Sequence, residues 1–223
     1  MGYSHYFDRP KVLPKAAFAA IRQDFAKLLP ELERIGLKLA GPLGKGPVEV
    51  GDDGIWFNGA HDCGHLSNQD LVIPWPSAKA GGIAKYNENA IDGTWFAGAS
   101  VEKRCCNGDC SYESFCFPVR LKKGEDYYRD PQAKDRGLVF QFCKTAFRPY
   151  DLAVICFLII AKRHLKTKLR VASDGEDGHW ADGRLFCQMH LGYGEEYHLV
   201  VKSKKAGQTL EAVEQPETAE LKK

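Results

Sequence analysis

The sequence has no long hydrophobic run, which limits where the protein can work. Its most apolar stretch, residues 152–161, falls well short of the roughly 18 apolar residues that a membrane-spanning helix needs. The first residues also lack a basic segment followed by an apolar one, so we expect no secretory signal. We therefore expect a cytoplasmic protein that does not associate with membranes.

The sequence also lacks an excess of one charge. Its 31 basic and 29 acidic residues give a formal net charge of +2, too balanced to indicate a nucleic-acid partner by charge alone. No Gly-x-Ser-x-Gly motif is present, and no glycine-rich segment lies between an expected strand and helix. The sequence therefore lacks the common nucleophile-elbow and dinucleotide-binding motifs. Its 223 residues suffice for one sizeable core.

Periodicity indicates three helices. Pro14 suits a first helical turn, Gly36 a helix end, and apolar residues between them recur at three and four positions. Pro149 opens a second helix, which contains the apolar run 152–161. A third follows, with Trp180, Leu185 and Met189 on its apolar face.

The middle of the chain is rich in strand signals. We predict hairpins from residues 48–50 with 55–57 and from residues 94–103 with 112–119, the latter turning at Asn107-Gly108. Further strands are expected at residues 3–7, 71–75, 138–143, 169–172 and 198–201, and a loop at 78–92. This pattern predicts one α+β domain over residues 1–201, with a central, mostly antiparallel sheet and about three helices packed on it. Residues 202–223 are charged and are expected to form a flexible tail.

The eight cysteines offer a candidate metal site. Without a secretory signal, free thiols or a metal are expected rather than disulfides. Zinc favours four nitrogen or sulfur ligands, often two from each of two loops. We predict a zinc site, structural rather than catalytic, built from Cys63 and His65 or His61, with Cys105 or Cys106 and Cys110. The alternative is free thiols in a solvated turn.

A second candidate is a polar pocket where an expected strand leads into the Pro149 helix. Lys144, Thr145, Tyr150 and Asp151 lie there, and helix N-termini favour anions such as phosphate. The alternative is a solvated lysine and a first-turn Asp151. No glycine-rich cradle is present, so this is not a P-loop.

A third candidate follows the expected strand at 169–172. Asp174, Asp177 and His179 are potential acid–base groups, with Trp180 beside them. The alternative is a turn and a helix cap, in which Ser173 or Asp174 bonds to backbone amides.

Five segments follow one another in a recognisable order: Tyr3-Ser-His5-Tyr6, Phe57-Asn58-Gly59, Phe142-Cys143-Lys144-Thr145, Pro149-Tyr150-Asp151, and Ser173-Asp174-Gly175 with Trp180. Over residues 1–192 the chain resembles a family of small tailed-phage and prophage proteins without an established activity. The resemblance implies a phage-infected host cytoplasm and hardly any chemistry. The cysteine-rich turn and the tail are not part of that pattern.

Three functions fit these observations. The first is a phage-associated protein that binds a small polar or phosphorylated, nucleotide-like ligand, and the second is a metal-dependent hydrolase of nucleotides. The third is a protein–protein module that inhibits a host factor through the cysteine-rich turn. For the first function we predict a binding set of seven residues: Asn58, Lys144, Thr145, Tyr150, Asp151, Asp174 and Trp180.

Overall fold

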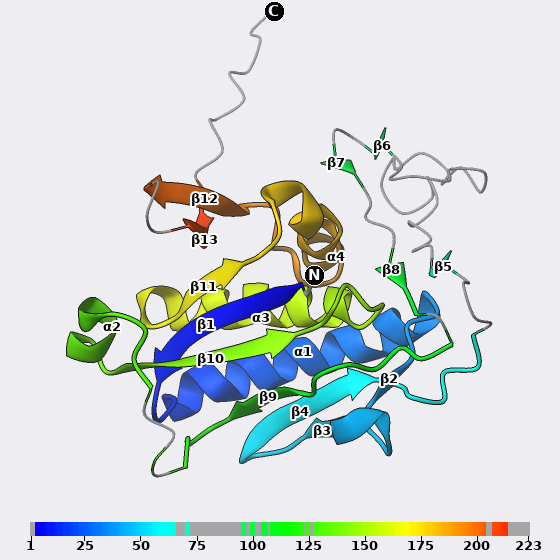
Figure 1. The fold of residues 1–223 in the computed structure, drawn as a ribbon, viewed down its shortest axis with the longest axis horizontal. Coiled ribbons are helices and arrows are strands. Elements are labelled where there is room, and N and C mark those ends of the chain that lie inside the picture. The colour runs from blue at the N-terminus through cyan, green and yellow to red at the C-terminus, as the bar shows by residue number, and fades with distance from the viewer. Residues whose placement is uncertain are drawn as a thin grey trace, which may run out of the picture.

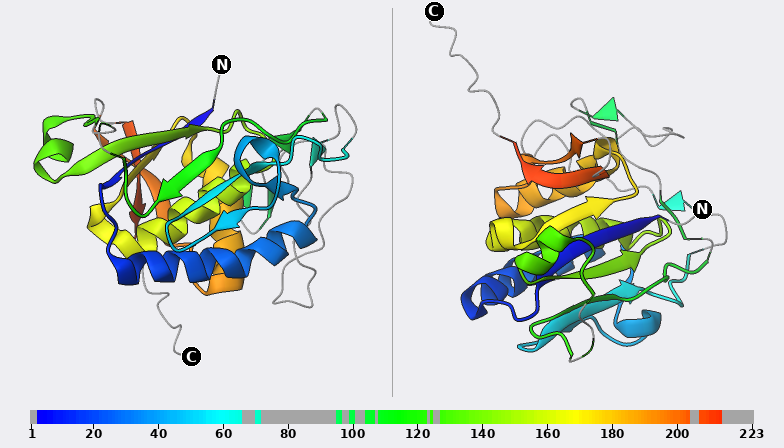
Figure 2. Two further views of the ribbon diagram at one scale, coloured as in Figure 1. Left: turned by 90° about the horizontal axis from the view of Figure 1, so that it is seen from below. Right: turned by 60° about the vertical axis from the view of Figure 1, so that its left-hand side comes forward.

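The structure is a computed structural model that describes residues 3–65, 70–71, 95–96, 99–100, 104–106, 108–122, 124, 127–203 and 207–213. These residues form two larger antiparallel sheets, two further two-stranded pairs, and helices on one side of the larger sheets (Figures 1 and 2), so the predicted α+β class is confirmed. No helix among the described residues is long and apolar enough to cross a membrane.

The larger sheet has five strands in the order β10-β1-β11-β13-β12. Strand β1 (Ser4–Pro10) lies between β10 (Leu138–Lys144) and β11 (Arg170–Ser173), and pairs with both. Strand β13 (Gly207–Ala212) joins β11 to β12 (Tyr197–Ser203). The first strand of the chain is thus near the middle of the sheet.

The second sheet centres on β4 (Gly54–Gly59). It pairs with β3 (Glu49–Val50), as predicted for the first hairpin, and with β2 (Leu39–Ala40) and β9 (Phe115–Pro118). The remaining short elements are β5 (Asp70–Leu71) paired with β8 (Arg104–Cys105), β6 (Trp95–Phe96) paired with β7 (Ala99–Ser100), and the 3-10 turn η1 (Pro42–Gly44).

Helix α3 (Asp151–Leu165) is the centre of the core. It packs against α1 (Lys15–Arg34) and α4 (Ala181–Leu191), and the Phe157 ring contacts aromatic rings of the second sheet. A helix buried on all sides is apolar all round, which explains the continuous run at 152–161. The other helical elements are α2 (Pro131–Asp135), η3 (Lys166–Lys168) and η4 (Asp177–Trp180).

The second predicted hairpin is wrong. Strand β9 pairs with β4, and β6 and β7 pair with each other, so none of the described residues within 94–103 is a partner of 112–119. Burial explains this choice, because Phe115 and Phe117 of β9 are fully buried in the core that Phe57 of β4 and α3 share. The turn at 108 connects two cysteines rather than two strands.

Two other expectations concern the ends of segments. Residues 207–212, which we assigned to the tail, form β13, and their Leu210 is fully buried. The pairing of Val200 with Thr209 extends the sheet beyond residue 201. The expectations for residues 72–75, 78–92 and 214–223 lie outside the described residues.

Candidate metal centre and the buried centre beside it

Four side chains form a candidate metal centre: Cys63, His65, Cys106 and Cys110. One ligand atom from each lies within 4.8 Å of all the others, so the group can hold a metal ion. The Cys110 sulfur and the Nδ1 atom of His65 are 3.3 Å apart. With Zn–S bonds of about 2.3 Å, the ligands of a tetrahedral zinc site lie roughly 3.5–3.8 Å apart, so the four atoms need only a small contraction.

The candidate ligands come in two pairs from two short segments. Cys63 and His65 are separated by Gly64, whose φ of +74° is a left-handed conformation that glycine adopts readily. In the second pair the Asp109 amide donates to the Cys106 carbonyl at 2.9 Å, which closes the turn before Cys110. Pairs of ligands that lie close in sequence are found in many structural zinc sites.

The two turns are held against each other independently of any metal. The Cys110 amide donates to the Ala60 carbonyl at 3.1 Å. A Cβ atom on Gly59 would lie 1.9 Å from the Cys110 carbonyl oxygen, so glycine is required at this contact. His61, predicted as an alternative ligand, lies outside the cluster, and its Nδ1 pairs with the Asp109 carboxylate at 3.0 Å.

The thiols of the cluster are crowded together, and a bound cation would stabilise their thiolate forms. Burial raises the pKa of the Cys110 thiol, and the neighbouring sulfurs of Cys63 and Cys106 raise it further. A bound divalent cation reverses this effect, because it stabilises the thiolates that crowd around it. Of the predicted pair Cys105 or Cys106, the cluster contains Cys106, and only the backbone of Cys105 is described, in β8.

We call the two segments that carry the candidate ligands, residues 63–65 and 106–110, the metal turns. Two arginines join them to the core. Arg148 donates to the backbone carbonyls of Cys106 and of Asp109, the latter at 3.0 Å. Arg104, two residues before Cys106, is fully buried and points its guanidinium between the carboxylates of Asp151 and Asp182. The metal turns are thus attached to a buried polar network.

That network, which we call the His5 centre, gathers residues from five segments of the chain. The Asp151 carboxylate accepts hydrogen bonds from His5 Nε2 at 2.8 Å and from the Thr145 hydroxyl at 2.6 Å. Arg104 Nη2 donates to the other Asp151 oxygen at 3.2 Å. Trp180 completes the centre, with its ring centroid 5.3 Å from that of His5.

The buried Asp151 of the His5 centre stays ionised although burial opposes its charge. Burial alone would raise the pKa of Asp151, but the attraction of His5 and Arg104 and the hydrogen bonds from His5 and Thr145 lower it overall. Asp182 is fixed in turn by Arg104 and by the backbone amide of Gly183, which donates to it at 2.7 Å. Asp151 is therefore a carboxylate at neutral pH.

The seven predicted ligand-binding residues do not form one cluster. Thr145, Asp151 and Trp180 belong to the His5 centre. The Asn58 amide donates to the Tyr112 carbonyl at 2.9 Å, and the Lys144 ammonium lies 5.5 Å from the Tyr112 ring.

Tyr150 and Asp174 also have structural partners. The Tyr150 hydroxyl donates to the Glu113 carbonyl at 2.6 Å, so Asn58, Lys144 and Tyr150 all hold the segment that follows Cys110. Asp174 accepts from the Ser4 amide at 3.0 Å and from the Tyr6 hydroxyl, which fixes the start of β1.

The other acid–base candidates also serve structural roles. Asp177 accepts from His198 at 2.9 Å and from the Leu199 amide at 2.7 Å, which attaches η4 to β12. His179 accepts from the Glu176 amide as part of a helix cap.

Sequence reasoning missed His5, Arg104 and Asp182 of the His5 centre, and it left Cys106 as one of two alternatives for the metal cluster. For Cys106, the Cys-x3-Cys spacing to Cys110 was the available signal. For the other three no local pattern exists, because their partners are distant in the sequence.

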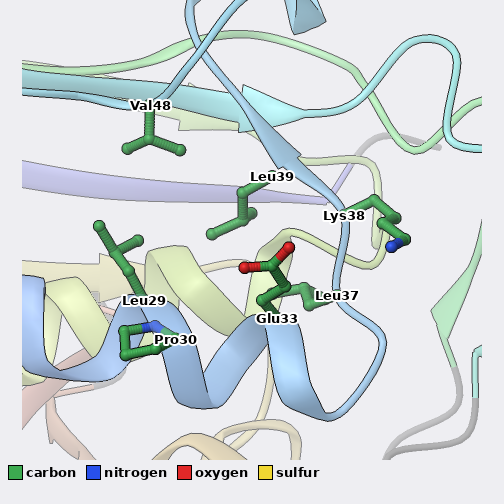
Figure 3. A pocket seen from close by; sticks show the side chains of 7 residues that line it. All are labelled: Leu29, Pro30, Glu33, Leu37, Lys38, Leu39 and Val48. Carbon is green, nitrogen blue, oxygen red and sulfur yellow. The ribbon is translucent and has the colours of Figure 1, made fainter.

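Three cavities along the described residues lie away from both centres. Figure 3 shows the side chains that line one of about 360 Å³, which include apolar side chains of α1 and β2 together with Glu33 and Lys38. The other two have volumes of about 350 and 290 Å³. None of the predicted site residues lines these three cavities.

No protein-family model matches the chain, and no curated protein or solved structure matches it. The resemblance to phage proteins therefore stays a prediction. Four of its five segments supply residues of the His5 centre: His5, Thr145, Asp151 and Trp180.

Proposed function

We propose that the chain is a zinc protein in which Cys63, His65, Cys106 and Cys110 hold one structural ion. The observation that carries this proposal is the approach of four nitrogen and sulfur ligand atoms to within 4.8 Å of one another. A set of thiolates with one imidazole favours zinc over magnesium or calcium, which prefer oxygen ligands.

A structural ion is favoured over a hydrolytic one. Catalytic zinc sites keep one position open for water, whereas this group offers four protein ligands. The acid–base candidate Asp177 is bonded to β12 rather than directed at the cluster. The ion's role in this proposal is to join the segment 63–65 to the turn at 106–110, and so to hold Arg104 in the His5 centre.

Elemental analysis of protein purified without a metal-affinity tag tests the proposal. Four ligands for one ion predict about one equivalent of zinc. Cys106→Ser is expected to lose it, whereas Cys116→Ser, which changes an exposed thiol outside the cluster, is expected to retain it. Cobalt(II) added to metal-free protein should give the intense visible absorption of a tetrahedral thiolate site. Zinc below about a tenth of an equivalent in the unmodified protein, with no cobalt spectrum, would contradict the proposal.

A further inference from the structure

One of the three cavities, of about 350 Å³, is lined almost entirely by polar and charged side chains. It lies where α2, the C-terminal end of α3, η3 and the strands β11 and β13 meet. Three of its lining residues carry a cation, Arg136, Lys162 and Arg170, and one, Glu211, carries a carboxylate. Arginine stays protonated at any pH at which proteins are folded, so this excess of positive charge persists at neutral pH. A cavity with such a charge favours an anion.

Carboxylates compensate two of these cations. Arg170 donates to Asp130 at 2.9 and 3.2 Å, and its Nε atom lies 3.6 Å from an oxygen of the buried Asp8. The Lys162 ammonium lies 3.2 Å from an oxygen of Glu211. These ion pairs hold both cations at the cavity wall, so a ligand that binds there does not have to order them.

The third cation, Arg136, has a different environment. Its side chain is exposed, and its guanidinium donates to the carbonyl of Thr167, which is a neutral group. Within the part of the chain that the structure describes, no carboxylate pairs with it. Together with their ion-pair partners, the lining residues therefore have one cation more than they have carboxylates. The cations are Arg129, Arg136, Lys162 and Arg170, and the carboxylates are Asp8, Asp130 and Glu211.

A buried hydroxyl group lines the same cavity. The Oγ1 atom of Thr209 is buried and has no hydrogen-bond partner among the described residues. Thr209 and Glu211 alternate along β13, so their side chains lie on the same face of the strand. Buried polar atoms in native proteins are almost always paired. An unpaired hydroxyl at the wall of a cationic cavity therefore indicates a ligand that accepts a hydrogen bond.

We propose that this cavity binds a small phosphorylated sugar. Its phosphate would accept hydrogen bonds from the Arg136 guanidinium, whose planar donors match phosphate oxygens, and from the Thr209 hydroxyl. Its sugar hydroxyls would bond to the Glu211 carboxylate and the Gln132 amide, which line the same cavity. A volume of about 350 Å³ is at the small end of the range for ligand sites and leaves room for more than a phosphate ion. The cavity is separate from the metal cluster, and the proposal goes beyond the metal function.

Ribose 5-phosphate is the probe, added at physiological ionic strength to the full chain as purified with its metal. Calorimetry is expected to show saturable binding to one site. Ribose, which has no phosphate, is expected to give no saturable heat, and inorganic phosphate, which has no sugar, is expected to bind more weakly than the probe. These two comparisons separate the contribution of the charge from that of the sugar.

Variants locate the binding. Arg136→Met is expected to weaken it by about tenfold or more, and Arg136→Lys, which keeps the charge, by less. Thr209→Val removes only a hydroxyl and is expected to weaken binding by roughly two- to tenfold without lowering the melting temperature, because that hydroxyl has no described partner to lose. Arg34→Met, at an exposed pair with Glu31 on α1, is the matched control and should bind as the unmodified protein does.

Four outcomes would overturn the proposal. One is the absence of saturable heat with ribose 5-phosphate, which would leave the cations with structural roles alone. A second is equal binding of ribose, since it would remove the role of the phosphate. A third is equal binding of inorganic phosphate, since it would remove the role of the sugar. The fourth is full binding by folded Arg136→Met and Thr209→Val, since it would place the site elsewhere.

Discussion

The candidate metal cluster and the His5 centre are joined through Arg104 but are built in opposite ways. The cluster takes its four candidate ligands from two short segments, residues 63–65 and 106–110, so most of its geometry is local in sequence. The His5 centre takes one or two residues from each of five segments, and only the complete sheet and helices bring them together. A local site tolerates changes elsewhere in the fold, whereas a site made of distant segments reports on the whole fold.

The largest expected loss of folding stability comes from removing the buried cation of the His5 centre. Arg104→Met would leave Asp151 and Asp182 buried without their shared cation, and removing one partner of a buried ion pair costs about 3–5 kcal/mol. Urea unfolding measures this loss. Arg22→Met, at a surface pair with Asp52, is the control and should cost less than about 1 kcal/mol. A similar, small loss of stability in both variants would contradict the role of Arg104 as the cation that Asp151 and Asp182 share.

Metal removal addresses the other centre. At free zinc a thousandfold above its Kd, a bound ion stabilises the folded state by about 4 kcal/mol, so a chelator should lower stability by a similar amount. The same treatment should shift the ¹H–¹⁵N NMR signal of the Trp180 indole, because Arg104 and Arg148 connect the metal turns to the core. An unchanged Trp180 signal after complete metal loss would show that the two centres are independent.

A smaller effect is expected where the metal turns touch. Gly59→Ala would place a Cβ atom 1.9 Å from the Cys110 carbonyl oxygen, and the forced backbone shift should cost about 1–3 kcal/mol. Gly64→Ala has open space around its Cβ atom but a φ of +74°, so we expect about 1 kcal/mol from strain alone. Thermal unfolding in the presence of zinc distinguishes the two, and the reverse order would contradict the close contact at Gly59.

The smallest effect is a difference in acid sensitivity. The folded-state pKa of Asp151 is lowered, so its contribution to stability is present above the unfolded value of about 3.9 and is lost as pH falls through the lower folded value. Asp151→Asn should therefore flatten the stability curve below about pH 4. The comparison uses metal-free protein, because acid also protonates the metal ligands. Equal slopes in both proteins would show that Asp151 contributes no acid sensitivity.

The sequence predicted those elements whose structure depends on local residues alone. The apolar spacing from Phe18 to Leu32 predicted α1, and the uninterrupted run at 152–161 predicted the buried helix α3. The hairpin of β3 and β4 followed from its turn residues. The partner of β9 did not, because strand pairing depends on which buried face a strand completes, and that face comes from distant residues.

The same limit divided the candidate sites. Cys63, His65 and Cys110 were identifiable because metal ligands cluster in turns. Asp151 and Trp180 were singled out for their local positions, but His5 was not, because neither of its partners is near it in sequence. A network of long-range hydrogen bonds leaves no periodic or motif signal.

The inner position of β1 has a consequence for how the chain is made. Residues 4–10 leave the ribosome long before their partners at 138–144 and 170–173. At about 5–20 residues per second, this strand must wait many seconds before it can pair. During synthesis it is an unprotected strand with the aromatic residues Tyr6 and Phe7, and unpaired strands of this kind aggregate readily. We therefore expect the yield of folded protein to depend on the speed of translation and on chaperones that cover this strand until its partners are made.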